Sequence, residues 1–117
     1  MITLATLPKA TEQEVFDQIV GHLLEQNAAS SNVWGQAMYL DEMGRKSATG
    51  CLIGSDEYST DVEGLSWDEL IEAEIVPDDH RSLIFELQYI HNFYSVNEWR
   101  KALNDLGDQL GLTWKFG

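Results

Sequence analysis

Hydrophobic residues recur every three or four positions near the start of the chain, the spacing that places them on one face of an α-helix. This stretch runs from about Glu12 to Asn27 and opens with Thr11 and Glu14. These two residues form a capping box, in which each side chain accepts a hydrogen bond from the other residue's backbone N–H. We therefore predict an amphipathic helix here. Its apolar face comprises Val15, Phe16, Ile19, Val20, Leu23 and Leu24.

The same capping pattern returns twice in the second half of the chain. Ser66 with Glu69 predicts a short helix that runs toward Glu74. Ser95 with Glu98 predicts a longer helix, because apolar residues follow it at helical spacing. That apolar face comprises Val96, Trp99, Leu103, Leu106 and Leu110, and Gly111 ends the helix.

A third main helix is expected between these two, capped by Asp78 and ending near Tyr94. Its core-facing stripe comprises Leu83, Ile84, Leu87 and Ile90. Phe85 and Tyr89 fall away from that stripe, so they predict an apolar patch outside the main core. Packing of the C-terminal tail explains such a patch, and so does a contact with a partner or a second copy.

The helical period is lost between residues 33 and 48. Ala37–Leu40 and Arg45–Ala48 flank a turn that contains Gly44, which indicates a β-hairpin. The tail Leu112–Phe116 alternates between apolar and polar residues and is expected to form an edge strand. The whole chain, residues 1–117, is thus predicted to be one mainly helical α+β domain, with about three amphipathic helices, one short helix and a small antiparallel sheet.

The composition indicates the cellular compartment and the kind of partner that the protein favours. The chain carries 20 Asp and Glu against 7 Lys and Arg, a net charge of −13. This charge disfavours direct binding to nucleic acid and to anionic membranes and favours basic partners. No signal-peptide pattern or membrane-spanning run is present, and Cys51 is the only cysteine, so we expect a soluble protein of a reducing compartment, the cytoplasm.

Half of the acidic residues fall between Leu52 and His80, a stretch without Lys or Arg. A solvated face that promotes solubility explains this distribution, and a surface for a basic partner also does. Under the second reading, the partner-binding residues are Asp56, Glu57, Asp61, Glu63, Asp68, Glu69 and Glu72.

The middle of the chain contains Gly50–Ile53 followed by Asp56–Tyr58, with Tyr39, Gly44, Lys46 and Ala48 upstream. In this pattern it resembles a group of short bacterial and bacteriophage proteins of uncharacterised activity. Leu40 and Ser47 depart from the group's pattern, which places Arg and Cys there. The resemblance implies a bacterial or phage origin and transfers neither a reaction nor catalytic residues.

The sequence offers two possible catalytic arrangements. Cys51 at the start of a helical turn, with His80 or His91 as its base, would make a nucleophilic set, and the two histidines with Asp78 or Asp79 would bind a divalent metal. The alternative explanations are that Cys51 is a buried structural residue and that the histidines lie on the surface or cap helices. The sequence also lacks the common nucleotide-binding and serine-hydrolase motifs, and no cofactor is predicted.

The leading hypothesis is a small binding protein, not an enzyme, that docks its acidic surface onto a basic surface of another protein. A phage-encoded inhibitor of a host nucleic-acid-handling or defence protein is one concrete form, because a dense set of carboxylates mimics the charge of a phosphate backbone. The alternatives are a small enzyme that uses Cys51 or a histidine and carboxylate site, and a structural homo-oligomer formed through Phe85 and Tyr89.

Overall fold

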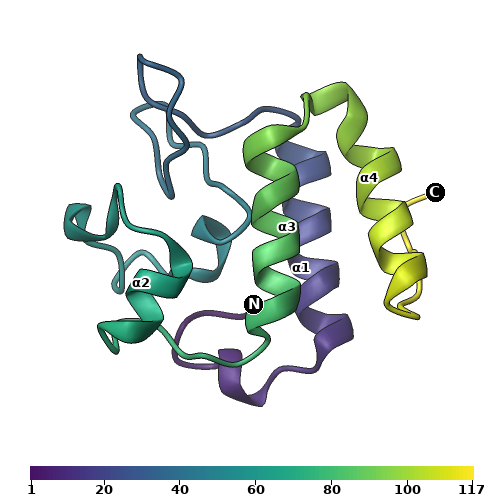
Figure 1. Ribbon diagram of the computed structural model, residues 1–117, viewed down its shortest axis with the longest axis horizontal. Coiled ribbons are helices and arrows are strands. Elements are labelled where there is room, and N and C mark those ends of the chain that lie inside the picture. The colour runs from purple at the N-terminus through teal and green to yellow at the C-terminus, as the bar shows by residue number, and fades with distance from the viewer.

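The computed structural model describes all 117 residues and is built mainly from helices. α1 and α3 lie side by side at the centre, α4 covers one side of them, and α2 with its neighbouring loops forms a lobe on the other side (Figure 1). The four α-helices are α1 (Glu12–Gln26), α2 (Trp67–Glu72), α3 (Arg81–Phe93) and α4 (Val96–Gln109). Three 3-10 turns accompany them, at Leu7–Lys9, Gly50–Leu52 and Thr60–Val62.

All three capping boxes predicted from the sequence are present, at the starts of α1, α2 and α4. The start of α3 differs from the prediction, because its N-cap is His80 and not Asp78. His80 takes a left-handed backbone conformation, with φ of 60°, and its Nε2 lies 2.8 Å from the carbonyl oxygen of Ala10. A tertiary contact with the N-terminal segment therefore determines where α3 begins. The local sequence around Asp78 contains no sign of that contact.

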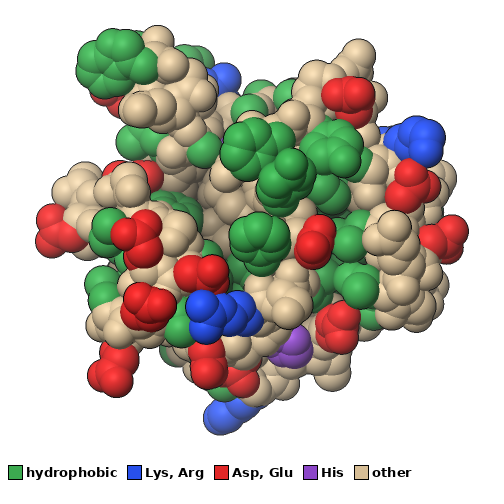
Figure 2. Space-filling view, viewed as in Figure 1, with side chains coloured by type: hydrophobic (Ala, Val, Ile, Leu, Met, Phe, Trp, Pro, Cys, Tyr) green, Lys and Arg blue, Asp and Glu red, His purple; other side chains and the backbone are tan.

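The hydrophobic core lies between α1, α3 and α4 and continues beneath the Gly50–Leu52 turn. The apolar face predicted for each of these three helices contributes side chains to this core. Its largest fully buried side chains include Phe16, Ile19, Leu52, Leu87, Trp99 and Leu103. Outside this core, hydrophobic side chains gather over α3, and acidic side chains lie around them (Figure 2).

The prediction of an α+β fold is wrong, because the protein contains no sheet. The expected hairpin is reduced to one isolated antiparallel bridge between Leu40 and Lys46. The Tyr39 N–H, which would bond to the Ser47 carbonyl if the ladder continued, donates to the Glu63 carboxylate instead. The outward-facing N–H groups of Leu40 and Lys46 donate to Glu63 and to Gln26 Oε1. The bend predicted around Gly44 does form, with φ of 80° at that glycine.

The tail Leu112–Phe116 likewise forms no strand, so that prediction is also wrong. Its backbone bonds to side chains of the helices. Gln13 Oε1 on α1 accepts from the backbone N–H of Thr113, and Arg100 on α4 donates to the Phe116 carbonyl. The Trp114 ring meets Phe16 edge to face, with ring centroids 6.4 Å apart. The tail thus closes the core between α1 and α4.

Gly50 is the first residue of the Gly50–Leu52 turn, and its Cα packs directly against the backbone of Tyr39. A Cβ atom at residue 50 would collide with the carbonyl oxygen of Tyr39, which is backbone and cannot rotate away. We expect Gly50→Ala to lower the free energy of unfolding by about 3 kcal/mol, the upper range for overpacking. Urea denaturation measures the change.

Gly21→Ala is the matched control, because a Cβ there would meet only the Phe116 ring edge at 3.4 Å. It lies inside α1, so alanine should be neutral or stabilise by up to about 1 kcal/mol. Equal effects of the two substitutions would contradict the packing described at Gly50.

Candidate functional site

The most unusual surface feature is a ridge of four exposed aromatic side chains along α3, defined by Phe85, Tyr89, Phe93 and Tyr94. Phe93 is 72 % exposed and the others are 42 to 54 % exposed. The Tyr89 ring is central, with its centroid 4.8 Å from that of Phe93 and 6.4 Å from those of Phe85 and Tyr94. The patch predicted at Phe85 and Tyr89 is therefore confirmed as exposed, and it is larger than the sequence indicated. The tail, which lies between α1 and α4, leaves it uncovered.

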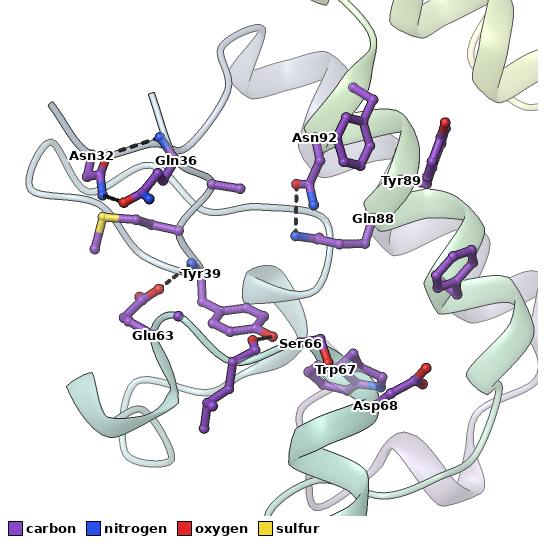
Figure 3. A pocket seen from close by; sticks show the side chains of 16 residues that line it. Asn32, Gln36, Tyr39, Glu63, Ser66, Trp67, Asp68, Gln88, Tyr89 and Asn92 are labelled. Atoms are coloured by element: carbon purple, nitrogen blue, oxygen red, sulfur yellow. Dashed lines mark hydrogen bonds between the residues drawn. The ribbon is translucent and has the colours of Figure 1, made fainter. Parts of the chain in front are cut away.

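A cleft of about 470 Å³ separates this ridge from the loops of the α2 lobe. One wall is the outer face of α3. The other is an arm of irregular chain, residues 30–47, together with residues 63–68. Gln88 and Asn92 extend from α3 toward Gln36 and Tyr39 on the arm (Figure 3). Trp67 also lines the cleft, and its buried indole N–H has no acceptor.

A second hollow of similar volume lies on the far side of the ridge, between α3 and α4. Tyr89 lines both hollows. The basic groups near the ridge are paired: Arg81 Nε lies 2.9 Å from Asp68 Oδ1, and Lys101 Nζ lies 2.8 Å from Asp105 Oδ2. The unpaired charge beside the ridge is therefore acidic, and Glu86 on α3 contributes to it.

Four of the seven carboxylates proposed for partner binding make hydrogen bonds or ion pairs within the fold, and Glu57 and Glu63 make the most of them. Glu57 accepts from the backbone N–H groups of Leu4, Ala5 and Gly54 at 2.8 to 3.1 Å, which ties the N-terminal segment to the middle of the chain. Burial by itself would raise the pKa of Glu57, but these three hydrogen bonds outweigh it and lower the pKa.

Glu63 anchors the arm to the chain ahead of α2. Besides the N–H groups of Tyr39 and Leu40, its carboxylate accepts from the Tyr58 hydroxyl at 2.7 Å. Burial raises the pKa of that phenol to about 12, with a further contribution from Glu63. The Tyr58 hydroxyl is thus a permanent donor to this carboxylate near neutral pH.

The other five acidic residues of the set lie on the surface of the α2 lobe in different states. Glu69 completes the capping box of α2 with Ser66, and Asp68 pairs with Arg81. Asp56, Asp61 and Glu72 are exposed, and their carboxylates make no hydrogen bond or ion pair within the protein. These three are the members of the set that remain free for a partner.

Cys51 does not have the environment of a nucleophile. Its thiol donates to the Ala48 carbonyl at 3.1 Å, and burial raises its pKa to about 12, so the thiol stays protonated near neutral pH. The two candidate bases lie elsewhere: His80 contacts Ala10, and His91 contacts Ser30 and Asn92. No three His, Cys, Asp or Glu side chains converge as metal ligands.

His91 is buried, and the centroid of its ring lies 5.6 Å from that of the Trp99 ring, with the two planes tilted by 33°. Its Nε2 accepts from the backbone N–H of Ser30 at 3.0 Å, so its proton is on Nδ1, which donates to Asn92 Oδ1 at 2.8 Å. Burial lowers the pKa of His91 most strongly, the bond to Asn92 opposes this, and the nearby His22 lowers it further. The neutral ring thus connects α3 to the arm.

No protein-family model matches the chain, and comparison with curated proteins and with solved structures finds no similar protein. None of the helices is both long enough and apolar enough to cross a membrane.

Sequence reasoning missed the cleft, because its walls come together only in the folded chain. Gln88 and Asn92 carried one available signal, since they lie four residues apart on the polar side of a helix, next to Phe85 and Tyr89. Nothing local placed the arm opposite them. Phe93 was missed as well, because it falls in the last turn of α3.

If Glu57 is structural and Glu72 is not, alanine substitutions should separate them. Glu57→Ala leaves three backbone N–H groups without their acceptor and should cost about 2 kcal/mol or more. Glu72→Ala, at an exposed helical position, should change stability by less than about 0.5 kcal/mol. Urea denaturation tests both, and equal stabilities would contradict the role assigned to Glu57.

Because the pKa of His91 is lowered on folding, protonation favours the unfolded chain. Its contribution to stability is complete above the unfolded-state pKa of about 6.5 and is lost as the pH falls through the folded value. We expect the Tm of the wild type to fall below about pH 6.5, before the carboxylates titrate. His91→Gln should lower the Tm near pH 7 but flatten this part of the curve, whereas parallel curves would rule out His91 as the cause.

Proposed function

We propose that this protein binds a basic region of another protein, with the aromatic ridge of α3 as its anchor. The observation that carries the proposal is the ridge itself: four neighbouring aromatic side chains, 42 to 72 % exposed, between two hollows. Contiguous apolar surface of this kind marks interaction sites. Tyrosine in particular is enriched among the residues that dominate binding energy.

Charge supports a basic partner. The net charge of −13 raises the rate of encounter with a positive surface, and this effect weakens as salt screens it. Both cations beside the ridge are already paired with aspartates. Asp56, Asp61 and Glu72 are free on the adjoining lobe and would contribute to steering, while the desolvated aromatic contact would supply most of the affinity.

A phage-encoded inhibitor that occupies the nucleic-acid-binding surface of a host protein is one concrete form of this proposal. The resemblance of the Gly50–Ile53 region to phage proteins and the acidic charge motivate it. A homo-oligomer formed through the same ridge has less support, because each copy would bring a further 13 negative charges. A cysteine-based enzyme has less support still, because the Cys51 thiol is protonated.

Site-specific cross-linking tests the ridge directly. We would place the photoreactive residue p-benzoylphenylalanine at Phe93 and, as a control, at Asn104 on the exposed side of α4. In bacterial lysate, position 93 should give a discrete product with a basic protein, and position 104 should not. The product should be lost when Tyr89→Ser is added, and it should weaken in about 0.5 M salt, where charges are strongly screened.

Identical products at the two positions, or products that survive Tyr89→Ser, would overturn the ridge as the binding site. A product formed only between two copies of the chain would favour the homo-oligomer. Light scattering on the purified protein then gives the number of copies.

A further inference from the structure

The amide side chains that line the cleft have a defined polarity. On α3, Gln88 Oε1 accepts from both the backbone N–H and the hydroxyl of Thr49, each at 3.0 Å. Gln88 Nε2 then donates to Asn92 Oδ1 at 3.2 Å, and His91 Nδ1 donates to the same oxygen. This series of hydrogen bonds starts from the backbone N–H groups of Thr49 and Ser30, and a backbone N–H can only donate. The orientation of the Asn92 amide follows from them: its oxygen is used, and its NH2 group is free.

The arm repeats this arrangement on the opposite wall. Asn32 Oδ1 accepts from the backbone N–H groups of Trp34 and Gln36, so its nitrogen donates to Gln36 Oε1, at 2.8 Å. Gln36 Nε2 has no partner within the protein. Both walls of the cleft therefore end in a free amide NH2 group, and the oxygens of those amides are already hydrogen-bonded.

Donors on both walls select for acceptors in the occupant. The backbone carbonyls of an extended chain meet this requirement, because they are unpaired and successive ones point to opposite sides. An α-helix does not, because its carbonyls are bonded within the helix except in the last turn. Phosphate groups also carry acceptors, but the acidic surroundings repel them.

We propose that the cleft binds an extended segment of the partner protein, with backbone carbonyls accepting from Asn92 Nδ2 on one wall and Gln36 Nε2 on the other. An apolar side chain of the segment packs on Phe85 and Tyr89 at the edge of the cleft, and a Lys or Arg of the segment faces the acidic groups outside it. This inference rests on the proposed function and specifies which part of the partner is recognised.

His91 acts here as a positioning residue, because it contacts no occupant. Its neutral ring connects the Ser30 N–H to the Asn92 oxygen, which fixes the orientation of the Asn92 amide and leaves its NH2 group without a partner within the protein. The indole N–H of Trp67, buried at the same cleft without an acceptor, shows that the free protein leaves a donor there unpaired.

Random 12-residue peptides displayed on phage and selected against the full-length protein provide the probe. The selected peptides should combine Lys or Arg with an apolar residue, and isothermal titration of the tightest peptide gives its Kd. Asn92→Asp should weaken binding about tenfold or more, a loss of about 1.4 kcal/mol. The carboxylate still accepts from His91 and Gln88, so the fold is retained while the donor is removed. Gln36→Glu should act in the same direction.

Asn104→Asp is the matched control, since it adds the same charge on α4 away from the cleft and should leave the Kd within about twofold. If Tyr89→Ser abolishes binding but Asn92→Asp does not, carbonyl recognition is overturned and the ridge survives as the binding site. If no peptide is selected, or neither substitution matters, the cleft proposal is overturned. The cross-linking result at Phe93 then decides separately whether the ridge binds a partner.

Discussion

The segment between α1 and α2 contains almost no regular secondary structure. Its buried backbone N–H and carbonyl groups must nevertheless be hydrogen-bonded. Side chains meet this requirement in place of a sheet. Glu57 and Glu63 bind backbone N–H groups at several points, and Asp41, whose carboxylate is almost inaccessible, binds those of Ser31, Met43 and Arg45. The shape of the whole α2 lobe depends on these carboxylates, which explains part of the acidic composition as structural.

That constraint also creates the candidate site. Glu63 and the hydrogen bonds of His91 fix the position of the arm, and the outer face of α3 beside it has no covering element. Tyr89 is thus nearly half exposed on a helix whose other face is fully packed. In the complex that we propose, the surface charge would favour a basic partner, and the aromatic ridge and the amide donors would give the contact its position and polarity. The structural carboxylates thus also shape the proposed binding surface.

Local sequence predicted the helices well because their signals are local: capping boxes such as Thr11 with Glu14 and apolar stripes both appear within one or two turns. It failed for the hairpin and the tail, where acceptors distant in sequence, such as Glu63 for Tyr39, outcompete strand pairing. The exposure of Tyr89 was predictable from the helical period. The cleft was not, since the arm residues that line it lie more than 40 positions before the facing residues of α3 in the chain.

The most direct test of the account is the structure of the protein in complex with its tightest selected peptide. We predict an extended peptide between α3 and the arm, with one carbonyl on Asn92 Nδ2 and an apolar side chain against Tyr89. A peptide bound on the exposed carboxylates of the α2 lobe, or in the hollow between α3 and α4, would contradict the account, because the binding determinants would then lie outside the cleft.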